Sequence, residues 1–459
     1  MRRILECALL LAYAAWPAAA QPAPQQPTPY ARSIAAGYKA LMLCGAMFNA
    51  GRTREQAEAL ELTGIYPEYD AIVPTLPVEI RTHPDDAARP SSAEVLVPFD
   101  DRLPPRRAVW ARNTGCTVLP IGGFGDRHPP FDPPSFAGSL DDRPWPTGDG
   151  GIAPRAPAAL DAAVARAFDG AWSGRTTGVV ILRDGRVVAE HYAEGFGPHV
   201  AQRTWSVAKS IAGTLIGIGV RERLVDVRTT PALVKLDRRA AIRIDHLLRM
   251  ASGLHGDTAG NRTDALYFGG ATVDEERDHL LLEADPGTRF RYANNDIVLA
   301  IRALRTALRD DARYEAFPRA ELFAKLGMTR TVAERDWGGN FVLSSQVWST
   351  ARDLARLGQL WLQDGVWNGE RILPEGWMRY MTAASGPQPA DGPGYGATLW
   401  LFGPEQGLPE GSYAAQGNRG QFIMVVPSRK LVIVRRGEDR AGAGFDIAGF
   451  SAAVLEALE

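Results

Sequence analysis

Two β-hairpin patterns that lie far apart in the chain constrain its fold most strongly. The stretch 176–196, TTGVVILRDGRVVAEHYAEGF, has two β-rich runs around Asp184-Gly185, a dipeptide that favours a tight hairpin turn. The stretch 421–436, QFIMVVPSRKLVIVRR, predicts a second hairpin. Apolar residues at helical spacing fill most of the chain between them, and an amphipathic helix pattern closes it. These patterns predict one large α/β domain of the α+β type over 157–459, with an antiparallel sheet closed by both ends of the domain.

The start of the chain has the pattern of an export signal. Residues 1–20, MRRILECALLLAYAAWPAAA, combine two arginines, a mostly apolar core and three final alanines. This pattern is typical of a cleaved Sec-type signal peptide. A membrane anchor is the alternative, but the apolar run is short for a bilayer span. Cleavage predicts a periplasmic or secreted protein with no integral membrane span after signal removal.

Three further segments precede the large domain. Residues 21–30 form a Pro/Gln-rich tether, and residues 31–122 predict a small α+β module. Within this module Thr53 and Gln56 have the spacing of a helix capping box, and three short runs between 93 and 121 have strand composition. Residues 123–156 are dense in Pro, Gly and Asp and predict a linker.

Two cysteines, Cys44 and Cys116, remain once the signal segment with Cys7 is removed. An even number of cysteines in an oxidising compartment favours a disulfide, which would stabilise a module of this size. Two separate buried thiols are the alternative.

Composition excludes several classes of partner. The net charge of −2 does not indicate the excess of positive charge that binds nucleic acid or an anionic membrane. The seven histidines lack metal-binding spacing, and no glycine-rich loop opens a βαβ unit, so we expect no metal and no cofactor. The expected partner is a small molecule, and the oligomeric state is left open.

The stretch 204–220, TWSVAKSIAGTLIGIGV, is apolar apart from Lys209, which follows Ser206 by three residues. Residues at this spacing share one face of a helix. Burial lowers the pKa of a lysine, so Lys209 could accept the proton of Ser206 and make it a nucleophile. The helix N-terminus would also direct backbone N–H groups at an oxyanion formed there. Alternatively, Ser206 only caps the helix and Lys209 reaches solvent.

Tyr292 and Asn294, within RFRYANNDIVLA, form a second candidate group. A tyrosine beside a lysine can share its proton and act in acid–base catalysis, and an amide can orient both the lysine and a substrate carbonyl. The alternative is a packed tyrosine at a helix start, followed by a capping asparagine.

Together, Ser206-x-x-Lys209, Tyr292-x-Asn294 and the intervening HLLRMASGL resemble the serine hydrolases of the class C β-lactamase, DD-peptidase and esterase superfamily. The resemblance covers about 170–459 and is greatest to the 6-aminohexanoate-oligomer (nylon-oligomer) hydrolase branch. It implies a β-lactamase/transpeptidase-like fold, an antiparallel sheet flanked by helices plus a helical subdomain. It also implies an acyl-enzyme on Ser206, with Lys209 and Tyr292 as general base and acid.

The third motif of this superfamily, usually Lys-Thr-Gly on a strand beside the site, is altered here. The matching place is Ala415-Gln416-Gly417. The resemblance makes the backbone N–H groups of Ser206 and Asn418 the oxyanion donors. The missing lysine predicts faster hydrolysis of a neutral short-chain ester than of any penicillin or cephalosporin.

Five residues are candidates for substrate contact. Gln416 and Gly417 belong to the altered motif, and Arg419 either replaces the missing cation or points outward to an acidic surface partner. Trp205 and Tyr395 either line the acyl pocket or only pack in the core.

These inferences predict an exported serine hydrolase that cleaves an ester or amide bond in a small or peptide-like substrate. The alternative is a non-catalytic penicillin-binding-type protein that recognises peptide or peptidoglycan fragments.

Overall fold

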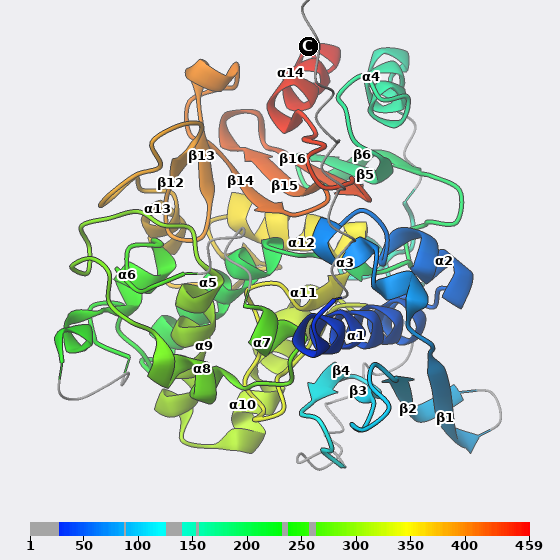
Figure 1. Ribbon diagram of the computed structural model, residues 1–459. Coiled ribbons are helices and arrows are strands. Elements are labelled where there is room, and N and C mark those ends of the chain that lie inside the picture. The colour runs from blue at the N-terminus through cyan, green and yellow to red at the C-terminus, as the bar shows by residue number, and fades with distance from the viewer. Residues whose placement is uncertain (1–26, 87–88, 125–139, 153–155, 232–236, 257–262) are drawn as a thin grey trace, which may run out of the picture.

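The computed structural model describes most of the chain (Figure 1). The described residues are 27–86, 89–124, 140–152, 156–231, 237–256 and 263–459. The expected signal segment 1–20 and most of the expected tether lie outside them. The tether is shorter than expected, because a helix already begins at Pro29.

A seven-stranded antiparallel sheet forms the centre of the large domain, in the order β12-β13-β14-β15-β16-β5-β6. Its strands are β5 (Thr176–Arg183), β6 (Arg186–Tyr192), β12 (Gly394–Tyr395), β13 (Trp400–Phe402), β14 (Ser412–Gly417), β15 (Gln421–Val426) and β16 (Leu431–Gly437). Both expected hairpins form, and β16 pairs with β5. The two ends of the domain therefore meet in one sheet, which confirms the predicted closure.

Helices cover both faces of this sheet (Figure 1). The helices of the large domain are α4 (Ala158–Phe168), α5 (Val207–Arg221), α6 (Ile244–Leu248), α7 (Asp264–Tyr267), α8 (Val273–His279), α9 (Asn294–Leu308), α10 (Asp311–Phe317), α11 (Ala324–Leu326), α12 (Ala351–Leu362), α13 (Trp377–Met381) and α14 (Ile447–Ala457). Helices α4 and α14 lie on one face of the sheet, and α5 and α12 lie on the other. Two small sheets accompany them. One has three strands, β7 (Gln202–Arg203), β9 (Val347–Ser349) and β8 (Val332–Ala333), and the other has two, β10 (Val366–Trp367) and β11 (Glu370–Arg371).

Alternating side chains of β5 divide the core into two layers. Val179 and Ile181 belong to the layer under α4 and α14, whereas Val180 and Leu182 belong to the layer that contains α5 and α12. Successive side chains of a strand point to opposite faces, so a strand covered on both sides is apolar throughout. This explains why the β5 sequence reads as a continuous apolar run.

The N-terminal part has its own four-stranded antiparallel sheet, in the order β1-β2-β3-β4. Its elements are α1 (Pro29–Cys44), α2 (Arg54–Leu60), α3 (Pro67–Asp70), β1 (Glu79–Asp86), β2 (Arg89–Val97), β3 (Arg106–Ala111) and β4 (Gly115–Leu119). The expected capping box at Thr53 and Gln56 forms at the start of α2. The sequence analysis missed β1, whose residues EIRTHPDD are polar and include a proline.

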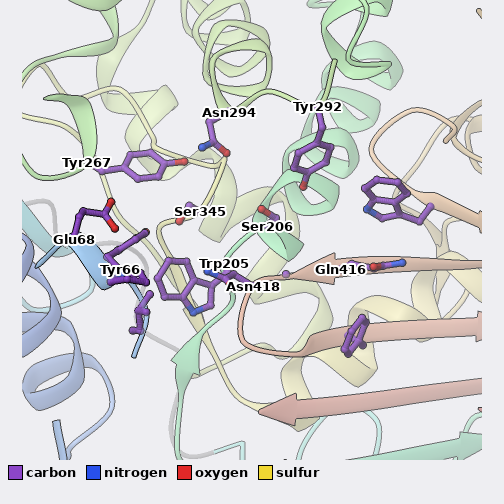
Figure 2. Close-up of a pocket in the computed structure, with 15 residues that line it drawn as sticks. Tyr66, Glu68, Trp205, Ser206, Tyr267, Tyr292, Asn294, Ser345, Gln416 and Asn418 are labelled. Carbon is purple, nitrogen blue, oxygen red and sulfur yellow. The ribbon is translucent and has the colours of Figure 1, made fainter. Parts of the chain in front are cut away.

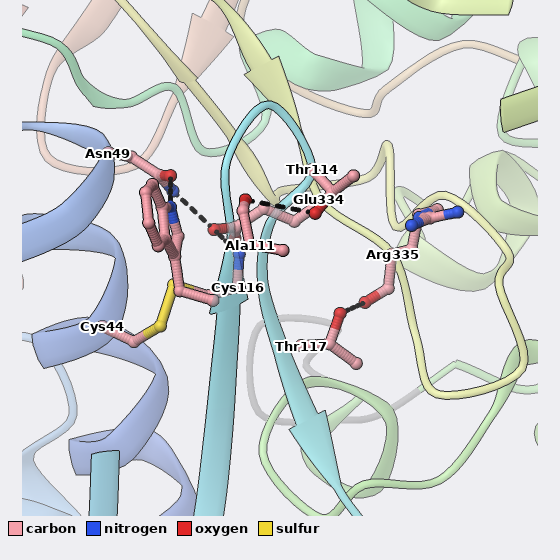
Figure 3. The surroundings of a disulfide bond; sticks show 9 residues. Cys44, Asn49, Ala111, Thr114, Cys116, Thr117, Glu334 and Arg335 are labelled. Carbon is pink, nitrogen blue, oxygen red and sulfur yellow. Dashed lines mark hydrogen bonds between the residues drawn. A yellow bond between two sulfur atoms is a disulfide. The ribbon is translucent and has the colours of Figure 1, made fainter. Parts of the chain in front are cut away.

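A disulfide joins Cys44 at the end of α1 to Cys116 in β4, as expected (Figure 3). Beside it, Glu334 Oε1 accepts hydrogen bonds from Asn49 Nδ2 at 2.8 Å and from the Cys116 N–H at 3.0 Å (Figure 3). The disulfide region is thus bound to a loop of the large domain.

The N-terminal part shares one hydrophobic core with the large domain. The ring of Tyr38 on α1 meets Phe268 edge-on at 5.2 Å, and Tyr66 meets Trp205 at 6.3 Å. Arg106 on β3 donates a hydrogen bond to Phe268 O at 2.9 Å. The expectation of a separate module does not anticipate this shared core, because contacts between segments distant in sequence leave no local pattern.

The described part of the expected linker 123–156 is also fixed in place. Trp145 Nε1 donates to Gly185 O at 2.9 Å, and Arg356 Nε donates to Pro146 O at 2.8 Å. Across the described residues, no helix has the length and apolar character needed to cross a bilayer.

Candidate active site

A tight turn places Ser206 at the N-terminal end of α5. Trp205, just before it, has φ of 50°, in the left-handed region that residues other than glycine seldom adopt. Such backbone strain concentrates at functional sites. Helix α5 is apolar on nearly all sides and is therefore buried, and its first turn carries Lys209 into the interior.

Lys209 lies at the centre of a buried hydrogen-bond group and is 1% exposed. Its Nζ is 2.9 Å from Ser206 Oγ, 2.6 Å from Asn294 Oδ1 and 2.8 Å from Ser344 O. Burial lowers the pKa of Lys209 to about 7. The alternative of a solvent-facing lysine is therefore wrong, and a neutral amine is available near neutral pH.

Tyr292 and Asn294 complete this group. The ring centroid of Tyr292 is 5.0 Å from Lys209 Nζ, and Figure 2 shows its hydroxyl directed toward Ser206. Burial raises the pKa of Tyr292 well above its usual value, and a hydrogen bond with Ser206 opposes this only in part. The cap of α9 is Ala293 rather than Asn294, whose amide instead holds Lys209.

The cluster opens into a cavity of about 540 Å³ (Figure 2). The lining residues are Ile65, Tyr66, Pro67, Glu68, Trp205, Ser206, Tyr267, Tyr292, Asn294, Ser345, Trp400, Gln416, Gly417, Asn418 and Phe422. They include most of the site residues expected from the sequence, Trp205 and the altered third motif among them. The cavity therefore brings together the three motifs of the resemblance.

Gly417 lets the end of β14 approach the start of α5. A Cβ at this position would lie 2.4 Å from Thr204 O and 3.1 Å from Ser206 N. Contacts this short with backbone atoms exclude any other residue without a shift of the strand. Glycine here lets the backbone of residue 417 lie beside the Ser206 N–H.

Arg419 is placed differently from the expectation. It has φ of 58° and is 5% exposed, so its side chain turns into the protein. Its guanidinium donates to Leu60 O at 2.6 Å and forms an ion pair with Glu438 at 3.0 Å. Glu438 is buried and requires a positive partner. Arg419 is therefore neither a cavity residue nor an outward-facing one, contrary to both expectations.

Tyr395 also lies outside the lining. It is 2% exposed and packs behind the cavity, against Tyr292 at 6.1 Å and Trp400 at 5.0 Å. It supports the ring of Tyr292 and does not contact the cavity, which corrects the expectation of substrate contact.

The sequence analysis missed two parts of the site. Residues 65–68 come from the N-terminal part, and no local pattern marks them as site residues. Ser345 is held by Arg203, whose Nη2 donates to Ser345 Oγ at 2.8 Å, and Tyr267 bonds to Ser344 Oγ at 2.5 Å. The carbonyl of Ser344 that binds Lys209 therefore belongs to a loop that side-chain hydrogen bonds hold in place.

One group of potential metal ligands exists among the described residues. Ligand atoms of Asp141, Asp149 and His199 lie within 4.8 Å of one another. However, Arg330 pairs with Asp141 at 2.8 Å and Arg356 pairs with Asp149 at 2.6 Å. Their charge is neutralised by arginines, so the group is an ion-pair cluster.

Sheet order, helix placement and the buried lysine one turn after a serine define the class of the molecule. It is a serine hydrolase of the β-lactamase and transpeptidase superfamily.

The family model named Beta-lactamase matches residues 163–436, more than half of the chain, and the chain therefore belongs to the beta-lactamase family. It is 28% identical over 291 residues to the 6-aminohexanoate-dimer hydrolase of Paenarthrobacter ureafaciens, covering 57% of this chain and 72% of that protein.

Solved structures show the same fold. One is a Bacillus anthracis protein provisionally named a 6-aminohexanoate-dimer hydrolase, with 23% identity, TM-score 0.53, and 71% of this chain and 86% of that one covered. Another is a Bacteroides dorei protein provisionally named a beta-lactamase, with 19% identity, TM-score 0.55, and 66% and 98% covered.

Proposed function

We propose that this protein is exported and hydrolyses an ester or amide bond through an acyl-enzyme on Ser206. The observation that carries the proposal is the hydrogen bond between Ser206 Oγ and Lys209 Nζ, 2.9 Å long, at the base of a cavity. A serine becomes a strong nucleophile when an adjacent base accepts its proton. The lowered pKa of Lys209, caused by burial, supports that role.

In acylation, neutral Lys209 accepts the hydroxyl proton as Ser206 Oγ attacks the substrate carbonyl. The N–H groups of Ser206 and Asn418 stabilise the oxyanion, because fixed donors in a low-dielectric site favour the charge that develops there. Tyr292, whose pKa is raised by burial, keeps its proton until it passes that proton to the leaving group. The serine proton then moves from Lys209 to Tyr292, which restores both groups before deacylation.

In deacylation, the same residues act on water. The Lys209–Tyr292 pair accepts a proton from a water molecule, which attacks the acyl carbonyl. The bond between the acyl carbon and Ser206 Oγ then breaks, and the pair returns the proton to Ser206 Oγ. Asn294 fixes Lys209 by its 2.6 Å hydrogen bond and orients the substrate. No step requires a cofactor.

The cavity favours linear neutral substrates over penicillins. The third motif has Gln416 where related hydrolases carry a threonine, and Ala415 where they carry a cation. Arg419 pairs with Glu438 and does not replace that cation. The similarity to a 6-aminohexanoate-dimer hydrolase supports short linear amides or esters as substrates. We expect a p-nitrophenyl short-chain ester to be hydrolysed with a higher kcat/KM than nitrocefin.

Covalent labelling tests the proposal. A fluorophosphonate probe should attach to Ser206, as located by peptide mass mapping, and Ser206→Ala should lose labelling and retain less than about a thousandth of the esterase activity. Labelling elsewhere, or a variant with more than about a tenth of the activity, would refute the acyl-enzyme. A protein that binds peptidoglycan fragments but neither labels nor turns over any ester would be the non-catalytic alternative.

Export rests on the apolar segment 1–20 and on the Cys44–Cys116 disulfide. N-terminal sequencing of the protein from a secreting host should find a mature chain that starts at Gln21. A full-length chain in the cytoplasm would contradict this part of the proposal.

A further inference from the structure

One side of the cavity comes from outside the segment that matches the beta-lactamase family. Residues 65–68, here called the N-terminal wall, line the cavity together with Ser206, whereas the family match begins at residue 163. The wall therefore lies outside the segment that the family model matches.

The N-terminal wall is held in position on both sides. Before it, Gly64 O accepts a hydrogen bond from the Ala441 N–H at 2.7 Å. After it, the Tyr69 hydroxyl donates to Asp264 Oδ2 at 2.5 Å. Tyr66 within it packs against the ring of Trp205. These contacts fix Glu68, at the exposed end of the wall, relative to Ser206.

Glu68 gives this cavity its charge. Among the described lining residues it is the one with a formally charged side chain. The other lining residues are neutral, and Tyr66, Trp205, Tyr267 and Trp400 present aromatic rings. Aromatic faces attract cations, and a carboxylate adds a direct ionic attraction. In Figure 2, Glu68 and Gln416 lie on opposite sides of Ser206.

We propose that Glu68 is a specificity residue that selects esters or amides carrying an ammonium group on the side of the scissile bond that faces the N-terminal wall. This inference rests on the proposed hydrolase function and adds a substrate class to it. A substrate carboxylate on that side is repelled by Glu68, whereas an ammonium group is attracted to the carboxylate and to the aromatic rings.

Two matched substrate pairs test the proposal, because the charge can lie on either side of the reacting carbonyl. The first pair is two p-nitrophenyl esters of a six-carbon acyl chain, one ending in trimethylammonium and the other in the isosteric tert-butyl group. The second pair is acetylcholine and its neutral isostere 3,3-dimethylbutyl acetate. Each pair changes the charge and little else.

The measured quantity is the ratio of kcat/KM for the cationic member to kcat/KM for the neutral member. In at least one pair this ratio should be about three to five, the upper range expected for an exposed ionic contact. Glu68→Gln should bring this ratio to within about twofold of one. Glu55→Gln, which removes the same charge from exposed helix α2 outside the cavity, should keep the ratio. Added salt should lower it in the wild type.

A ratio at or below one in both pairs would overturn the proposal, as would a ratio that Glu68→Gln does not change. Turnover of the neutral substrates in the same experiment would still support the hydrolase function. If the wild type neither labels at Ser206 nor hydrolyses the neutral members, the proposed function fails and this inference falls with it.

Discussion

Asn294 Oδ1 accepts a hydrogen bond from Lys209 Nζ at 2.6 Å, and the carbonyl of Ser344 accepts another at 2.8 Å. A neutral amine has two N–H groups and one lone pair. With both N–H groups bound by these acceptors, the lone pair of neutral Lys209 points to the remaining neighbour, Ser206 Oγ. This geometry supports the proposed role of Lys209 as the proton acceptor for Ser206.

The first prediction concerns pH. The pKa of Lys209 is lowered to about 7 by burial, and its neutral form is the active base, so kcat/KM for a neutral ester should rise with pH and level off above about 7. Asn294→Asp should shift this limb to higher pH, since a nearby carboxylate favours the ammonium form. If kcat/KM does not change between about pH 5 and 9, Lys209 is not the general base.

The second prediction concerns coupling between the lysine and the tyrosine. Lys209→Ala and Tyr292→Phe should each slow acylation by about a thousandfold or more, and the double variant should be little worse than either. The reason is that both act on one proton. Stopped-flow release of p-nitrophenol measures the rates. If the logarithm of the rate loss in the double variant equals the sum of the logarithms for the two single variants, the two residues act independently.

The third prediction concerns Gly417. Alanine there would place a Cβ 2.4 Å from Thr204 O, which should displace the Asn418 N–H from the oxyanion. We expect kcat to fall by about a hundredfold or more, the cost of losing one oxyanion donor. Gly197→Ala is the control, because a Cβ at Gly197 meets no atom within 4 Å. Equal activity of both variants would contradict the assignment.

The fourth prediction concerns the disulfide between Cys44 and Cys116, which are 72 residues apart. Closing a loop of that length should stabilise the folded state by about 4 kcal/mol. Replacing both cysteines by serine should lower the free energy of unfolding in urea by a similar amount. Activity at low temperature should persist, since neither cysteine lines the cavity. Two alkylatable thiols in the native protein would show that the disulfide does not form.

The fifth prediction separates structure from specificity at Arg419. Arg419→Ala leaves buried Glu438 without its nearest cation, so the free energy of unfolding should fall by about 3 kcal/mol. Turnover of neutral and carboxylated esters should fall by the same factor. A selective loss with carboxylated substrates would restore Arg419 to the role of a substrate ligand.

The sequence predicted those features that depend on neighbouring residues. Ser206 and Lys209 share a helix face because of their spacing alone. The turn at Asp184-Gly185 follows from the conformational preference of that dipeptide. Contacts between distant segments were not predictable. Arg419 turns inward to Glu438, which follows directly after β16. Glu68 reaches the cavity because the neighbouring Tyr66 and Tyr69 contact the large domain.

The N-terminal wall places the proposed choice of substrate and the proposed bond cleavage in different segments of the chain. The residues proposed to break the bond lie at or just before the N-terminal ends of α5 and α9, whereas residues 65–68 belong to the N-terminal part of the chain. Under the proposal that Glu68 selects the substrate, a substitution in this wall alters which molecules are accepted and leaves the reacting groups in place. The family match, which begins at residue 163, therefore does not include the segment that we propose to select the substrate.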